Sequence, residues 1–176
     1  MTPFQQILGA AFDNLPVPVR ALHALSSSAH TSGRAEVTAR ANPAAWMLRR
    51  VAGLPGPGTN VPVSVSFHPR GHGTGYWVRN FAGRRYASTM VAGVGGDEGL
   101  LIERFGPFRL MFRLAPSGEA LRWSLVRWQF LLIPLPSWTR PDIECSETGE
   151  TDRFNFDIDV IFPLVGHVLH YRGWLS

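Results

Sequence analysis

Apolar and polar residues alternate with a period of two over most of the chain after residue 60, which is typical of half-buried β-strands. In "VPVSVSF", for example, Val63, Val65 and Phe67 alternate with serines. Similar segments, separated by Gly-rich turns, are "YWVRNF", "RRYASTMV", "LLIERF", "PFRLMFRL", "LRWSLVRWQFLL", "RFNFDIDVIF" and "GHVLHYRGWL". With a strand in "GRAEVTAR" and a short one around Cys145, the pattern predicts nine or ten antiparallel strands.

The segment "LRWSLVRWQFLL" changes phase partway along its length. Trp123 and Leu125 are apolar at odd positions, whereas Val126 and Trp128 are apolar at even ones. In an unbroken strand, such a shift would turn half of the apolar side chains toward solvent. We therefore predict a β-bulge near Leu125 and Val126, which would restore the register and bend the strand.

The first 55 residues have helical signals. Thr2 is a suitable N-cap, with Pro3 in the first turn. Apolar residues with the spacing of one helical stripe follow, and these are Phe4, Ile7, Leu8, Ala11 and Phe12. "VRALHAL" predicts a shorter helix, and a third begins at Asn42-Pro43. The expected apolar side of the third helix consists of Ala44, Met47, Leu48 and Val51.

These elements predict one α+β domain over residues 1–176, of mostly antiparallel β-structure. Residues 1–55 form its helical part with one short strand, and residues 56–176 form its β part. Because many twisted strands with one apolar face curl, we expect a strongly curled sheet or a barrel-like meander. Two or three N-terminal helices should pack against one side or mouth of this sheet.

Composition excludes several classes of protein. All 17 basic residues are arginines, and they are scattered along the sequence, which argues against a nucleic-acid partner. The formal net charge is only +4, although the pI is about 10.2. A single cysteine excludes an intramolecular disulfide framework. We expect no transmembrane segment and no secretory signal, and hence a cytoplasmic location.

The order of several motifs resembles domain-of-unknown-function family 4166, over nearly the whole chain. The motifs are "LPVPVRALH", "GLPGPGTNVPVSVSF", "WVRNFAGRRYAS", "LIERFGPF", "LRW", "PLPSW", "FDIDVIFPLVG" and "YRGWL". The resemblance implies a bacterial domain that occurs alone or fused to an NAD(P)-binding reductase of the saccharopine-dehydrogenase type. It implies no established activity. No G-x-G-x-x-G lies on a strand-to-helix turn, so no dinucleotide or other cofactor is expected in this chain.

Two oppositely charged residues stand among apolar neighbours on predicted strands. Arg79 shares a strand face with Trp77 and Phe81, and Glu103 lies between two apolar residues on another strand. An unpaired buried arginine is costly, so we predict that Arg79 and Glu103 meet inside the curled sheet. Such a pair could fix the strand register alone, or it could form the polar floor of a pocket. Arg104 would face inward if the strand had the opposite phase.

The histidines and the cysteine give weaker indications. His68 and His72 are four residues apart in a loop, while His167 and His170, three apart on a strand, are expected on opposite faces. Polar loop and strand positions explain both pairs better than a zinc site does, and no metal is expected. Cys145 lies near Glu144 and Glu147, which should raise its pKa and reduce its reactivity. No nucleophile motif is present, and no catalytic residue is assigned.

The favoured function is therefore a binding module with an apolar pocket for a small hydrophobic or lipid-like molecule. Its expected lining consists of Trp77, Arg79, Glu103, Phe108, Phe112, Trp123 and Tyr171, with His23, Arg104 and Trp174 as secondary candidates. Tyr171 and Trp174 belong to "YRGWL", which is expected to dock at the sheet. In an alternative, the interior is solid and an outer patch with Trp128 and Trp138 docks a reductase or a second copy. A third reading is a small enzyme that uses His23 with Glu103 or Arg79.

Overall fold

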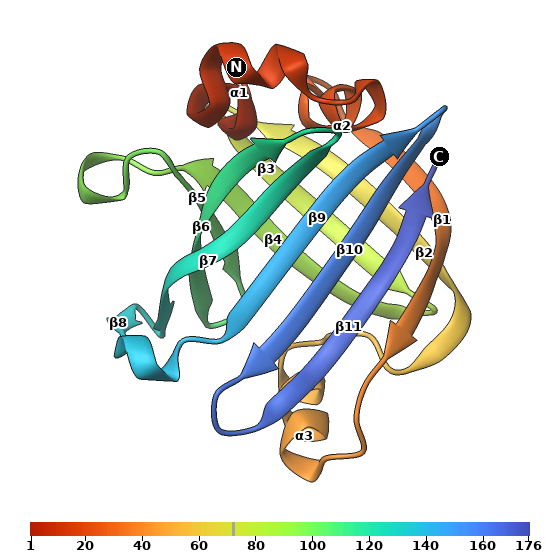
Figure 1. Cartoon of the computed structure of the whole chain (residues 1–176), viewed down its shortest axis with the longest axis vertical. Helices are drawn as coiled ribbons and strands as arrows, with labels where there is room; N and C mark the ends of the chain where they lie inside the picture. The colour runs from red at the N-terminus through yellow and green to blue at the C-terminus, as the bar shows by residue number, and fades with distance from the viewer. Residues whose placement is uncertain (72) are drawn as a thin grey trace.

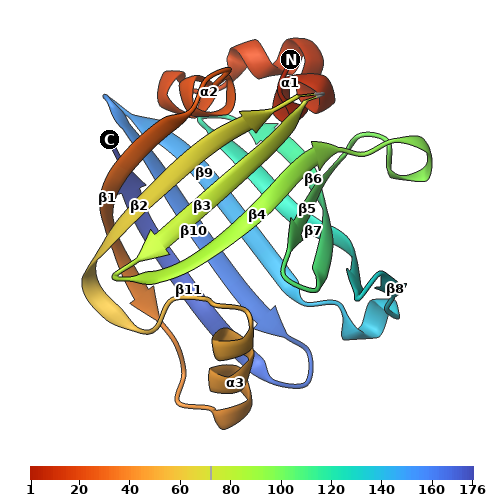
Figure 2. The ribbon, with the colours of Figure 1, turned by 180° about the vertical axis from the view of Figure 1, so that it is seen from behind.

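The structure is a computed structural model that describes residues 1–71 and 73–176. Its main feature is a closed barrel of ten antiparallel strands (Figure 1; Figure 2 shows the reverse side). The strand order around the barrel is β6-β5-β4-β3-β2-β1-β11-β10-β9-β7, and pairing of β6 with β7 completes the ring. The short strand β8 extends the sheet beyond β7. The prediction of a curled, mostly antiparallel α+β fold is confirmed.

The strands are β1 (Ala29–Thr38), β2 (Gly58–Arg70), β3 (Thr74–Phe81), β4 (Arg84–Ala92), β5 (Leu100–Phe105), β6 (Phe108–Ser117), β7 (Ala120–Phe130), β8 (Ile133–Pro134), β9 (Asp142–Glu150), β10 (Arg153–Phe162) and β11 (Gly166–Leu175). The α-helices are α1 (Pro3–Leu8), α2 (Val17–His23) and α3 (Pro43–Val51). Short 3-10 helices are η1 (Gly9–Asn14), η2 (Gly95–Asp97) and η3 (Ser137–Thr139). Within the described ranges, no helix is both long and apolar enough to cross a membrane.

The helices lie at the two ends of the barrel, which we call the N-terminal end and the α3 end (Figure 1). At the N-terminal end, Thr2 forms the predicted cap of α1, including a capping box with Gln5. The expected long stripe is only partly correct, because the chain continues from α1 as η1. Buried apolar side chains of the N-terminal segment close this end of the barrel, and they are Phe4, Phe12, Leu15, Val19 and Leu22.

Helix α3 covers the opposite end, so two of the three helices share one mouth of the barrel, as expected, and the third does not. Its buried residues are Ala45 and Arg49, and the predicted apolar residue Leu48 packs against the core, whereas Ala44, Met47 and Val51 are exposed. Nη1 of Arg49 donates a hydrogen bond of 2.7 Å to the carbonyl oxygen of Val168 in β11. The side of α3 that faces the barrel therefore combines this arginine with Ala45 and Leu48.

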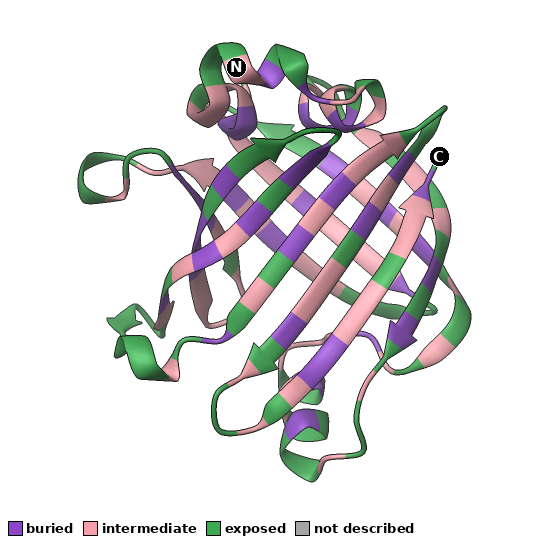
Figure 3. Ribbon diagram, in the orientation of Figure 1, coloured by how far each residue is buried: buried purple, intermediate pink, exposed green. Residues whose placement is uncertain are grey.

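The predicted bulge in β7 is present. Met111 pairs with Arg127 and Phe112 pairs with Leu125, so Val126 is the additional residue. The bulge allows the apolar side chains on both sides of it to face the same interior. Buried and exposed residues otherwise alternate along most strands, as Figure 3 shows.

A second irregularity places the β11 histidines differently from the prediction. His167 pairs with Ile161 and Leu169 pairs with Val160, so the strand gains a residue between them. As a result, both histidines form ion pairs with β10 carboxylates, His167 with Asp159 at 2.9 Å and His170 with Asp157 at 2.8 Å. The expectation of opposite faces is wrong, because it assumed a strand without a bulge.

Candidate functional site

The barrel encloses a cavity of about 160 Å³. At the N-terminal end, the buried helical side chains close it. Toward the α3 end, its lining includes the partly exposed residues Leu48, Leu54, Phe105 and Phe108. The cavity therefore opens at the α3 end. Its walls are almost entirely apolar and aromatic, and the polar groups are confined to a few positions.

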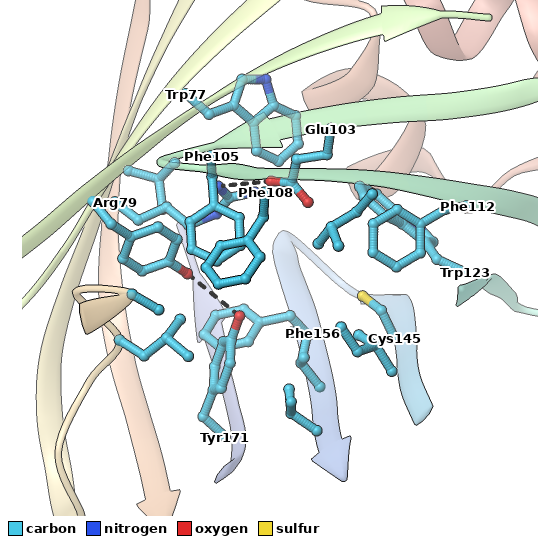
Figure 4. A pocket seen from close by; sticks show the side chains of 18 of the residues that line it. Trp77, Arg79, Glu103, Phe105, Phe108, Phe112, Trp123, Cys145, Phe156 and Tyr171 are labelled. Carbon is cyan, nitrogen blue, oxygen red and sulfur yellow. Dashed lines mark hydrogen bonds and ion pairs between the residues drawn. The ribbon is translucent and has the colours of Figure 1, made fainter. Parts of the chain in front are cut away.

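Arg79 and Glu103 meet in this cavity, as predicted (Figure 4). Nη1 of Arg79 lies 3.3 Å from Oε1 of Glu103, and the two side chains are only 14% and 13% exposed. The same nitrogen donates a hydrogen bond of 2.8 Å to Oγ of Ser88. The guanidinium also lies 5.1 Å from the ring centre of Trp77 and 5.3 Å from that of Tyr86. Two aromatic rings and a carboxylate thus hold the arginine in place.

The electrostatics of the site keep Arg79 charged. Burial by itself lowers the pKa of a guanidinium, since the charged form loses solvation. Tyr86 and Glu103 outweigh this effect, and the pKa of Arg79 is held above its ordinary value. Because Glu103 lies so close, the pair as a whole adds no net charge to the cavity.

Two tyrosine hydroxyl groups form a second polar position in the cavity. The hydroxyl oxygens of Tyr86 and Tyr171 lie 3.4 Å apart, where either can donate to the other (Figure 4). Burial is the largest cause that raises the pKa of both tyrosines. Both hydroxyl groups therefore stay protonated, and they can donate to or accept from a bound molecule.

A further buried polar group lies near the N-terminal end of the barrel. Nε2 of His23 lies 2.6 Å from Oε2 of Glu147, which also accepts a hydrogen bond of 3.2 Å from Nε1 of Trp123. The His23 ring stacks on Phe4, with 3.7 Å between ring centres. Its other nitrogen, Nδ1, has no hydrogen-bond partner within the described residues. His23 thus joins α2 to the barrel wall, and its partner is Glu147 rather than Glu103 or Arg79.

All seven predicted lining residues do line the cavity, including Phe108, Phe112 and Tyr171. The secondary candidates do not. Arg104 is exposed on the outer side of β5, and Trp174 lies beneath the guanidinium of Arg153, 4.4 Å from its ring centre. His23 is buried beside the cavity but is absent from its lining.

The two tryptophans of the expected outer patch do not lie on the same surface. Trp128 is buried and lines the cavity, whereas Trp138 is 67% exposed. The bulge at Val126 explains the difference, because it returns Trp128 to the interior.

Sequence reasoning missed three polar residues of the interior, Tyr86, Ser88 and Glu147. Tyr86 and Ser88 share a strand face with the apolar Met90, and Glu147 shares one with Cys145. The alternation alone could have placed all three inside. Their partners could not be found in this way, since pairing depends on how the ring closes.

Cys145 is held in its protonated thiol form. Burial is the main cause that raises the pKa of Cys145 well above its ordinary value, and Glu147 adds to it. Glu144 instead accepts a hydrogen bond from Ser124. His68 contacts Ser28, while His72 lies outside the described residues. Over residues 1–71 and 73–176, no three His, Cys, Asp or Glu side chains gather closely enough to hold a metal ion.

Comparisons with known proteins support the fold and the family. A family model described as "Domain of unknown function (DUF4166)" matches residues 15–175. The crystal structure of Rv2717c from M. tuberculosis is similar, with a TM-score of 0.51 and 12% sequence identity, over 92% of this chain and 98% of that chain. At this identity, the likeness concerns the fold alone. A search of curated proteins finds no match.

Proposed function

The chain belongs to the DUF4166 family, whose description names no activity, and we propose from its cavity that it binds a small hydrophobic or lipid-like molecule. The observation that carries this proposal is an apolar cavity with a buried Arg79–Glu103 pair and two tyrosine hydroxyl groups in its lining. Apolar walls with a few fixed polar groups are typical of small-molecule sites. The alternative of an accessory domain assumed a solid core, and the cavity argues against that assumption.

The volume of the cavity limits what it can hold. A dry apolar cavity of about 150 Å³ takes a molecule the size of benzene, and this cavity measures about 160 Å³. It is smaller than the several hundred cubic ångströms that enclose a drug-sized ligand. The head and first part of a ligand therefore fit inside, and a longer apolar chain extends through the opening at the α3 end.

The polar groups favour a neutral, oxygen-bearing head group. A ligand carboxylate would have to lie close to the carboxylate of Glu103, and the two would repel each other. The hydrogen-bond and ion-pair contacts of Arg79 within the described residues use Nη1, which leaves donors on Nε and Nη2. A hydroxyl or carbonyl oxygen can accept from these donors and from a tyrosine hydroxyl group. An alcohol, ketone or ester thus suits the site better than a fatty acid.

Native mass spectrometry of the purified protein, followed by solvent extraction, tests whether such a molecule is bound. Calorimetric titration then compares a long-chain alcohol with the alkane of equal length. The wild type should prefer the alcohol by about tenfold, which corresponds to one or two net hydrogen bonds. The double variant Arg79→Met/Glu103→Leu should lose this preference, because it replaces both charges with apolar groups.

A matched control is Arg109→Met, since Arg109 forms a similarly buried ion pair with Asp97 but does not line the cavity. This control should keep the preference for the alcohol. The proposal is wrong if the wild type contains no extractable molecule and binds neither compound, or if the double variant keeps the preference.

A further inference from the structure

The connections at the two ends of the barrel differ in charge. At the N-terminal end they contain several carboxylates and one arginine, namely Asp13, Asp97, Glu98, Glu119, Asp152 and Arg20. The connections at the α3 end are residues 39–57, 82–83, 106–107, 131–141 and 163–165. They contain Arg40, Arg49, Arg50 and Arg140, and neither aspartate nor glutamate. Of these arginines, all but Arg49 are exposed. The connections at the α3 end therefore carry a net positive charge, whereas those at the N-terminal end carry a net negative charge.

Large apolar side chains are exposed at this same end. We define the apolar rim as Trp46 and Met47 of α3, Leu131 and Leu132 after β7, Trp138 of η3, and Leu164 between β10 and β11. Each of them is more than half exposed, from 58% for Met47 to 84% for Leu164. They come from connections that lie on one side of the barrel in both views (Figures 1 and 2). Large apolar side chains that are exposed at one end of a molecule favour an interaction surface there.

The two leucines of the rim occupy an unfavourable backbone conformation. Phe130 pairs with Ile133, so Leu131 and Leu132 form the tip of a two-residue hairpin between β7 and β8. Both have positive φ angles, 51° and 66°. Such a tip favours Asn-Gly, because a side chain larger than that of glycine or asparagine is disfavoured there. Both leucine side chains are mostly exposed, so their burial does not offset this strain, and strain of this kind is often retained for function.

We propose that the α3 end docks on the surface of an anionic phospholipid bilayer. The Leu131–Leu132 tip and the two tryptophans of the rim enter the boundary between head groups and acyl chains, where apolar and indole side chains are favoured. The exposed arginines contact the lipid phosphates. Positive charge together with an apolar rim matches such a surface better than it matches a second copy of this chain, whose α3 end is equally positive.

The proposal concerns a surface, so it does not depend on what the cavity holds. It nevertheless concerns the end of the barrel at which the cavity opens, because Leu48 and Leu54 of the cavity lining belong to the connection that carries Trp46 and Met47. A molecule of the proposed class would pass between bilayer and cavity without crossing water.

Flotation with phospholipid vesicles tests the proposal. The wild type should bind vesicles of phosphatidylcholine mixed with phosphatidylglycerol, bind pure phosphatidylcholine more weakly, and lose affinity as salt increases. The decisive variant is Leu131→Asn/Leu132→Gly, which gives the hairpin its preferred tip. It should raise the melting temperature while weakening vesicle binding by more than about tenfold. A merely misfolded variant would not show both changes.

Controls come from exposed residues elsewhere on the molecule. Val17→Ser and Val94→Ser remove exposed apolar side chains at the N-terminal end and should leave vesicle binding unchanged. Arg40→Glu/Arg50→Glu should weaken it, whereas Arg122→Glu on the outer face of β7 should not.

The proposal is overturned if the wild type floats with neither vesicle type, or if the Asn-Gly variant binds as the wild type does. It is also overturned if the wild type is a dimer that the Asn-Gly variant converts to monomers, with no vesicle binding in either. Ligand extraction and vesicle flotation are separate measurements, so failure of the cavity proposal would be distinguishable from failure of this one.

Discussion

Nε2 of His23 lies 2.6 Å from Oε2 of Glu147, and this contact joins α2 to the wall of the barrel. The two residues are 124 positions apart in the sequence. Both side chains are almost completely buried, with 0% and 5% of their surface exposed. The carboxylate also accepts from Trp123, so removal of His23 leaves it with one partner. The contact therefore holds the N-terminal helical segment in place over the N-terminal end of the barrel.

We expect His23→Ala to lower the free energy of unfolding by about 3 kcal/mol or more, because it leaves a buried carboxylate incompletely paired. The matched control is His170→Ala, whose ion pair with Asp157 is on the surface. It should cost less than about 1 kcal/mol. Chemical denaturation measures both, and equal costs for the two variants would contradict a structural role for the buried pair.

The Arg79–Glu103 pair should show the asymmetry of a buried ion pair. Arg79→Met alone should destabilise the protein by about 3 kcal/mol, because Glu103 then lacks its partner in an apolar cavity. Arg79→Met/Glu103→Leu should recover most of this loss, because no charge remains to be desolvated. Denaturation of the wild type and both variants gives the comparison. If the double variant is as unstable as the single one, the cost lies in packing rather than in the unpaired charge.

Stability should decrease at alkaline pH. Burial raises the pKa of Cys145, Tyr86 and Tyr171, so the folded protein keeps protons that the unfolded chain releases above about pH 8.5 for cysteine and about pH 10 for tyrosine. Their contribution is complete below these values and is lost as the pH rises, by up to about 1.4 kcal/mol per pH unit for each group. Denaturation curves between about pH 7 and pH 11 test this. In Cys145→Ala, the free energy of unfolding should begin to fall only at a higher pH than in the wild type. If it begins to fall at the same pH, the thiol is not involved.

The strands, the bulge at Val126 and the Arg79–Glu103 pair could be predicted from the sequence, because each follows from local alternation. A charged residue at a position where its strand alternates to apolar must face inward. Because an unpaired buried charge is costly, two opposite charges there are expected to pair. Strand alternation also indicated the aromatic lining residues such as Phe108, Phe112 and Trp123, whereas Tyr171 was expected there from the docking of "YRGWL".

Other features depend on long-range geometry. The contact of His23 with Glu147 depends on where α2 lies over the end of the barrel, which no local pattern specifies. The face of α3 was predicted only in part: Leu48 packs against the core, but Arg49 is buried through its hydrogen bond to Val168 while Met47 and Val51 are exposed. The faces of His167 and His170 were predicted wrongly because one extra residue in β11 has no signal in the alternation.

The pairing of β1 with β11 has a consequence for how the protein is made. Gly33 lies opposite Leu175, and Ser32 and Ser176 exchange backbone hydrogen bonds. A Cβ atom at residue 33 would overlap the carbonyl oxygen of Trp174, so this seam is tight. During synthesis, β1 leaves the ribosome long before β11 and must wait with one edge unpaired. Until β11 is made, the free edge of β1 is therefore open to edge-to-edge association with other chains. Pairing with β11 then satisfies the backbone amide and carbonyl groups of this edge.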